Sequence, residues 1–105
     1  MAAYTKTIEN TIRSYVADVR SAMPIDRVFL FGSYAKGTAR DDSDVDICFF
    51  SQSFENQRAV DIIARLLGMT RDYLDIDIEP IVFPTSELTN DNPFVKEILR
   101  TGIEI

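Results

Sequence analysis

Histidine is absent from the 105 residues of this chain, and cysteine occurs once, at position 48. Without histidine, the chain itself holds no histidine-based zinc site, Ser-His-Asp triad or Cys-His nucleophile. A lone cysteine excludes an internal disulfide and is typical of a reducing compartment, so we expect a cytoplasmic protein in which Cys48 fills apolar space. No apolar run approaches the roughly 20 residues of a membrane span, and the first residues lack the layout of a signal peptide.

Basic residues are too few and too scattered for a nucleic-acid-binding surface. The chain has 11 Lys and Arg against 17 Asp and Glu, which gives a net charge of −6. Binding of duplex DNA depends on clustered basic side chains, so we expect no direct DNA binding. Eight of the acids form two groups far apart in the chain, which suggests one cation site in space. They are Asp41, Asp42, Asp44, Asp46, Asp72, Asp75, Asp77 and Glu79.

The length and the apolar pattern predict one domain over residues 1–105. A chain of this size buries somewhat over ~60% of the surface that it exposes when unfolded. Apolar residues at three- and four-residue spacing predict helices, and β-rich or alternating runs predict strands. The predicted order is α-β-α-β-α-β-α, an α/β domain with a small mixed three-stranded sheet flanked by helices. The elements are expected at residues 5–22, 25–31, 33–36, 45–50, 56–69, 73–83 and 92–100.

Local signals add detail to this scheme. Ser33 is predicted to cap the short helix after Gly32, and residues 38–43 are predicted to form an exposed polar loop. Pro80 suggests that the third strand lies at an edge of the sheet or contains a bulge. In the helix at 56–69, four apolar residues are predicted to lie on one stripe. These are Val60, Ile63, Ala64 and Leu67.

Residues 32–46 contain a Gly-Ser pair after one apolar strand and an Asp-x-Asp at the head of the next. Asp44 and Asp46 are two residues apart, so they project from the same face of a strand. Paired carboxylates repel each other unless a cation neutralises them, and Mg²⁺ favours such oxygen ligands. A third acid from residues 75–79 would complete a site for two Mg²⁺ ions ~4 Å apart, the arrangement used in phosphoryl displacement.

The Gly-Ser end of the same segment is suited to phosphate. Gly32 allows the backbone to approach an anion closely, and Ser33 offers a hydroxyl and a helix N-terminus. Lys36 and Arg40 are candidates for binding the outer phosphates. Gly32 and Gly37 have the spacing of a Walker A loop, but Thr38 occupies the position of the essential lysine, so that interpretation fails.

This combination, G-S-x₁₀-D-x-D between two apolar strands, resembles the DNA polymerase β-like nucleotidyltransferase superfamily, and in particular its minimal nucleotidyltransferase domains. The resemblance covers essentially the whole chain and implies the nucleotidyltransferase fold. It also implies that Ser33 holds the triphosphate, that Asp44 and Asp46 bind the metals, and that a third acid binds the catalytic metal and helps to deprotonate the attacking hydroxyl.

The third acid is left open by the sequence. Glu79 is followed by an apolar run and a Thr/Pro/acid-rich turn, which matches the small members of the superfamily best. Asp77 is the second candidate, because it lies between two isoleucines and has the more usual residue type. Asp75 is the third.

The resemblance implies an Mg²⁺-dependent enzyme that transfers AMP from ATP to a hydroxyl of a partner protein. Members this short often act as the antitoxin of a small helical HEPN protein, so we expect such a partner. Two alternatives stay open at this point. One is an antitoxin that binds its partner without catalysis, and the other is the core of an enzyme that modifies a small molecule such as an antibiotic.

Overall fold

A computed structural model describes residues 6–40 and 43–105 of the chain and shows a four-stranded sheet in the order β3-β2-β1-β4. The strands are β1 (Arg27–Phe31), β2 (Val45–Ser51), β3 (Ile78–Pro84) and β4 (Ile103–Glu104). The α-helices are α1 (Lys6–Ala22), α2 (Ser33–Lys36), α3 (Ala59–Gly68) and α4 (Pro93–Thr101). Three short 3₁₀ helices are η1 (Gln52–Asn56), η2 (Met69–Asp72) and η3 (Thr85–Leu88). No helix in the described part of the chain is both long and apolar enough to cross a bilayer.

The sheet is mixed, as predicted. β1 pairs antiparallel with β2 and with β4, whereas β2 and β3 are parallel and are joined by the crossover helix α3. β3 lies at an edge, which confirms the edge position indicated by Pro80. β4 was not predicted, because its two residues carry no pattern of their own and are extended only through pairing with β1. The third strand also begins at Ile78 rather than at residue 73.

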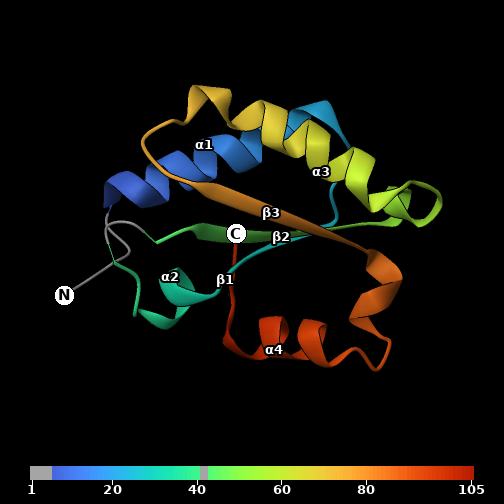
Figure 1. The fold of residues 1–105 in the computed structure, drawn as a ribbon. Coiled ribbons are helices and arrows are strands. Elements are labelled where there is room, and N and C mark those ends of the chain that lie inside the picture. Colours follow the sequence, from blue (N-terminus) through green and yellow to red (C-terminus); the bar gives the residue numbers. More distant parts are fainter. Residues whose placement is uncertain (1–5, 41–42) are drawn as a thin grey trace.

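Helices cover both faces of the sheet (Figure 1). α1 and α3 lie on one side, where the larger apolar cluster includes Tyr15 of α1, Phe49 of β2 and Leu66 of α3. The Tyr15 hydroxyl donates a 2.8 Å hydrogen bond to the Leu66 carbonyl and so ties the two helices together. α4 lies on the other side, where a smaller cluster joins Phe50 to Ile98 of α4. α2 follows the end of β1, and its buried Tyr34 belongs to the larger cluster.

The predicted apolar stripe of the third helix is not the part of α3 that packs in the core. In α3 the residues that reach the core are Ile62 and Leu66, while Val60 is 59% exposed and Leu67 is 43% exposed. The reason is that α3 is apolar around most of its circumference, so periodicity alone does not say which arc packs against the sheet.

Helix ends follow local chemistry in two places. The Asn92 side chain accepts hydrogen bonds from the backbone N–H groups of Phe94 and Val95, and Pro93 occupies the first turn of α4, as predicted. In α2, by contrast, Gly32 occupies the N-cap position and Ser33 is the first helical residue without a capping bond, so the predicted capping role of Ser33 is wrong.

Candidate active site

One end of the sheet brings the two halves of the sequence motif together. β1 ends at Phe31, whose antiparallel partner in β2 is Asp46, so Gly32 and Ser33 leave the sheet beside Asp46. The parallel register places Glu79 of β3 next to Asp46 on the other side. Asp44 lies two residues before Asp46, just ahead of β2. The Gly-Ser turn and three carboxylates therefore meet at this end.

Gly32 is fixed in its position by the Asp46 carboxylate. Its φ of 74° and ψ of −150° lie in a region that essentially only glycine adopts. A Cβ atom built on Gly32 would lie 2.3 Å from Oδ2 of Asp46, which is far inside van der Waals contact. The glycine is therefore required twice, for its backbone angles and for the space that its missing side chain leaves to Asp46.

Asp46 lies in an environment that disfavours its charge. Its pKa is raised, first by burial and then by the negative charges of Asp44 and Glu79. Asp44 and Glu79 themselves are exposed to solvent. A carboxylate that is partly buried between two other carboxylates is stabilised in its charged form by a cation.

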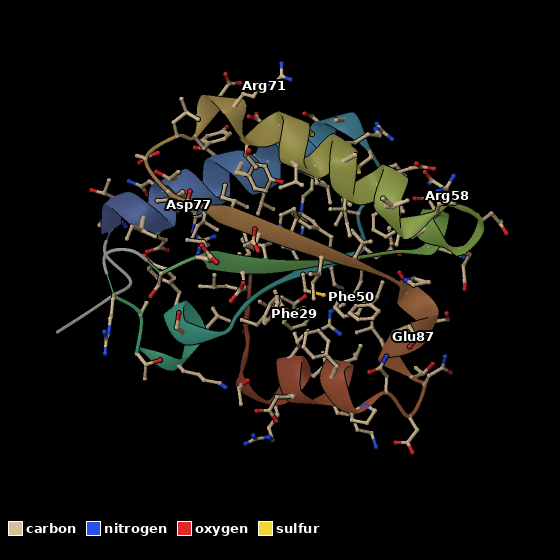
Figure 2. The ribbon with its side chains drawn as sticks, viewed as in Figure 1. Phe29, Phe50, Arg58, Arg71, Asp77 and Glu87 are labelled. Atoms are coloured by element: carbon tan, nitrogen blue, oxygen red, sulfur yellow. The ribbon has the colours of Figure 1, made fainter. Side chains whose placement is uncertain are left out.

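The geometry separates the three candidates for the third acid. Glu79 is the register partner of Asp46, and its charge contributes to the raised pKa of Asp46. Asp77 precedes β3 and uses its backbone carbonyl to accept a 2.7 Å hydrogen bond from the Val45 N–H; Figure 2 labels it near the start of the strand. Asp75 lies further back, in the exposed segment before β3. The register thus favours Glu79.

The donor set fits a hard divalent cation. Asp44, Asp46 and Glu79 supply only carboxylate oxygens, the ligands that Mg²⁺ prefers together with water and substrate phosphates. Within residues 6–40 and 43–105, no three acids converge closely enough to ligate one ion as they are placed. Asp41 and Asp42, which belong to the first acidic group of the sequence, fall outside the described residues.

The predicted phosphate-binding residues differ in how close they come to the acids. Ser33 is half-buried, and its hydroxyl makes no hydrogen bond to another described residue. Lys36 is exposed and helps Arg100, the larger cause, to lower the pKa of Glu97 in α4. Arg40 is exposed and donates its backbone N–H to the Ser43 hydroxyl, which shapes the loop ahead of Asp44.

The apolar wall beside the acids was not predicted as part of the site. Phe31, opposite Asp46, packs edge-to-face against Phe94 of α4, whose ring is 48% exposed. The alternation of side chains along paired strands could have predicted that Phe31 lies on the same face of the sheet as Asp46. Nothing in the sequence indicates that α4 packs on that face. Cys48 also lies on that face and is fully buried; burial raises its pKa to about 12, consistent with a packing role.

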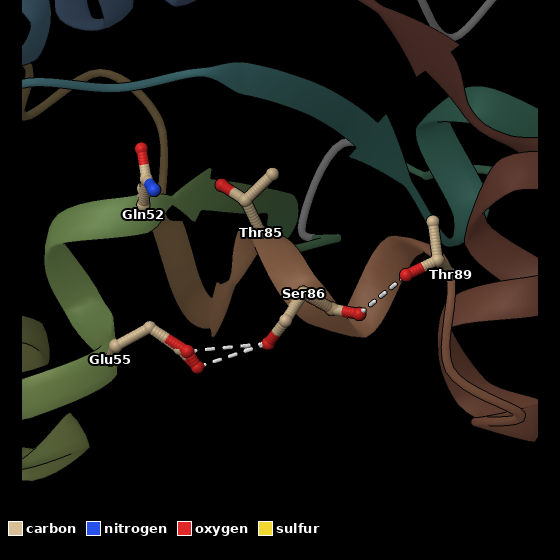
Figure 3. Close-up of a pocket in the computed structure, with 5 residues that line it drawn as sticks. All are labelled: Gln52, Glu55, Thr85, Ser86 and Thr89. Atoms are coloured by element: carbon tan, nitrogen blue, oxygen red, sulfur yellow. Dashed lines mark hydrogen bonds between the residues drawn. The ribbon is translucent and has the colours of Figure 1, made fainter.

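A hollow lies at the end of the sheet opposite to the acids (Figure 3). It is lined by Gln52, Glu55, Thr85, Ser86 and Thr89. Its one carboxylate, on Glu55, already accepts hydrogen bonds from the Ser86 hydroxyl at 3.0 and 3.3 Å. None of its lining residues is basic, so this hollow lacks the means to bind a triphosphate.

Residues 12–100 match the nucleotidyltransferase domain family. The chain belongs to this family. Among curated proteins, it is 28% identical over 96 residues to a protein of Methanocaldococcus jannaschii named "putative protein adenylyltransferase". That match covers 90% of this chain and 94% of the relative.

Solved structures of nucleotidyltransferases share the fold. A structure described as a "putative minimal nucleotidyltransferase" is 28% identical, with a TM-score of 0.62 and coverage of 91% of each chain. A toxin–antitoxin complex with AMP-PNP contains a chain with a TM-score of 0.65 and 22% identity, over 91% of this chain and 70% of the other. The predicted nucleotidyltransferase fold is therefore confirmed, with four strands in place of three.

Proposed function

We propose that this nucleotidyltransferase domain transfers AMP from ATP to a hydroxyl of a partner protein in an Mg²⁺-dependent reaction. The observation that carries the proposal is the position of Asp46, which lies against Gly32 and between the charges of Asp44 and Glu79. At this end of the sheet, the glycine that lets the backbone approach a phosphate lies beside carboxylates suited to bind a cation.

The residues take distinct roles in this reaction. Gly32 and Ser33 bind the triphosphate, with Lys36 and Arg40 available to its outer phosphates. Asp44, Asp46 and Glu79 are the residues that would hold two Mg²⁺ ions, and such ions would supply stabilisation of negative charge on the reacting phosphate. Glu79, whose side chain is exposed to solvent, accepts the proton of the acceptor hydroxyl. Asp77 is the alternative for that role. The hydroxyl oxygen forms a bond to the α-phosphorus, the bond to the β-phosphate oxygen breaks, and pyrophosphate leaves.

A protein acceptor is supported by two relatives. One is named as a protein adenylyltransferase, and another belongs to a toxin–antitoxin complex with an ATP analogue. We propose that the partner is a small helical HEPN-type toxin and that this chain is its antitoxin. Glu79 and Asp44 are exposed, so this chain leaves the acids open to a bound protein. The acceptor surface therefore comes from the partner.

The test is a transfer assay with the proposed toxin, for which the product of the neighbouring gene is the candidate. The two purified proteins are incubated with ATP and Mg²⁺, and the toxin is examined by intact mass spectrometry. We expect the mass of at least one added AMP with the wild type and none with an Asp44→Asn/Asp46→Asn variant. Glu55→Gln at the opposite end of the sheet is the matched control and should retain transfer.

The same assay separates catalysis from binding alone. An antitoxin that only sequesters its partner would bind the toxin equally well as wild type and as the double variant, with no mass added in either case. That result would contradict the enzymatic proposal.

A further inference from the structure

Helix α3 exposes more apolar surface than the domain itself can cover. Its buried residues Ile62 and Leu66 are 1% and 0% exposed, whereas Val60 and Leu67 are 59% and 43% exposed. With Ile63 and Ala64, the latter two form a stripe at i, i+3, i+4 and i+7, here called the α3 stripe. A helix that is apolar on nearly all sides is ordinarily buried on all sides.

The α3 stripe lies on the side of α3 that is turned away from the sheet. α3 covers the face opposite to α4 (Figure 1), whereas Phe31, the register partner of Asp46, packs against Phe94 of α4, so the sheet separates the stripe from the acid site. Arg58 and Arg71 mark the outer surface near the two ends of this helix in Figure 2. A molecule docked on the stripe would therefore leave Asp46 accessible.

Two opposite charges flank the stripe on one side. Asp61 and Arg65 are one helical turn apart, and their side chains are exposed. The Arg65 guanidinium makes no hydrogen bond or salt bridge to another described residue. Asp61 is 66% exposed and its one ion pair, with Arg58, is long at 3.9 Å. Exposed pairs of this kind contribute little to stability, so both charges are available to a partner.

We propose that the α3 stripe is a self-association surface on which α3 packs antiparallel against α3 of a second copy. In that register Val60 of one copy faces Leu67 of the other, and Ile63 faces Ala64, which pairs a large side chain with a small one. A two-fold axis also brings the equivalent flanks together, with the helices reversed. Asp61 then lies within one residue of Arg65 of the second copy, so the interface carries two reciprocal ion pairs.

The size and the edges of the domain shape this association. α3 has ten residues, about 15 Å of helix, so the contact belongs to the small class of interfaces and the dimer is concentration-dependent. Pairing through the sheet is the less suitable route, because Pro80 and Pro84 remove donors from the edge strand β3 and β4 has only two residues.

Sedimentation equilibrium of the whole chain alone, over about 10 to 500 µM, tests the proposal. We expect the wild type to approach twice the 11.9 kDa chain mass at the high end. Val60→Glu/Leu67→Glu should remain monomeric, with at least about ten-fold weaker association. The control Leu99→Glu, at a position 37% exposed on α4, should associate like the wild type. A wild type that stays monomeric, or a stripe variant that still dimerises, would overturn the proposal.

Charge exchange tests the antiparallel register and does not require apolar substitutions. Asp61→Arg and Arg65→Asp place like charges opposite each other in each homodimer, so each variant alone should associate about ten-fold more weakly. Mixed together, the two variants carry opposite charges along the whole flank and should form a heterodimer at wild-type strength. Failure of the mixture to associate would overturn this register. If the free chain stays monomeric and the α3 stripe becomes covered only in a complex with the toxin, the surface would be assigned to the toxin instead.

Discussion

Asp26 and Asp46 lie at opposite ends of the same sheet and have opposite electrostatic environments. Asp26 accepts hydrogen bonds from the Thr85 hydroxyl at 2.5 Å and the Gln52 N–H at 2.8 Å, and these donors lower its pKa. Asp46 is partly buried between Asp44 and Glu79, and its pKa is raised. Donors within the folded chain stabilise the charged form of Asp26, whereas the causes that act on the pKa of Asp46 all raise it. Under the proposed function, Mg²⁺ would neutralise the charge of Asp46.

The largest expected effect is on transfer activity. We expect Asp46→Asn to lower kcat/KM about 10³-fold, because it removes a ligand of the ions that stabilise the transition state. Asp26→Asn, an equally conservative change at the other end of the sheet, should stay within about three-fold of the wild type. Steady-state AMP transfer measures both. An equal loss of kcat/KM in Asp46→Asn and Asp26→Asn would contradict the claim that only the Asp46 end of the sheet is catalytic.

The third acid gives the next largest effect. Glu79→Gln should lower kcat/KM about 10²-fold if Glu79 binds the catalytic ion and takes the proton of the acceptor. Asp77→Asn should change it less than about three-fold, because the hydrogen bond to Val45 uses the Asp77 backbone rather than the carboxylate. The reverse order of the two effects would assign the role to Asp77.

The contact between Gly32 and Asp46 predicts a loss of folding stability. Gly32→Ala should lower the free energy of unfolding by about 2–4 kcal/mol, because the added Cβ meets Asp46 and the backbone angles are strained. Gly37 is the comparison, since it also has a positive φ, 75°, but lies in the left-handed region with a ψ of 19° and has no atom within 4 Å of an added Cβ. Gly37→Ala should cost only about 1 kcal/mol. Urea denaturation compares the two variants, and equal costs would show that neither the contact with Asp46 nor the backbone angles of Gly32 add to the loss of stability.

The smallest effect is on the pH dependence of stability. With a raised folded pKa, Asp46 favours folding below its unfolded pKa, and this contribution is lost as pH rises through the folded pKa. Asp46→Asn should therefore be more stable than the wild type near pH 7 without metal, and the difference should shrink toward pH 3. Asp26, with a lowered pKa, has the opposite sign, so Asp26→Asn should lose stability near pH 7. Urea titrations at both pH values check the two signs.

The parts of the fold and site that sequence could predict are those with a local cause. The Gly32 turn, the strand that begins near Asp46 and the Asn92–Pro93 helix start each depend on a few adjacent residues, and the structure has all three. The family pattern in residues 32–46 likewise needs no long-range information.

The parts that could not be predicted depend on contacts between distant segments. Glu79 becomes the neighbour of Asp46 only through the register of β2 with β3. β4 exists only because it pairs with β1, and which arc of α3 is buried is decided by the sheet beneath it. The sequence predicted that the two acidic groups meet and placed Glu79 first among three candidates, but only the register shows which acid is the neighbour of Asp46.

Calorimetric titration with ATP tests the central claim most directly, because that claim is that Asp46 and its neighbours form a cation-dependent nucleotide site. We predict that the wild type binds ATP with Mg²⁺ present and loses at least about ten-fold in affinity when EDTA replaces it. Asp46→Asn should bind weakly in both conditions, and Asp26→Asn should behave like the wild type. ATP binding that is equally tight in EDTA, or unchanged in Asp46→Asn, would contradict the account.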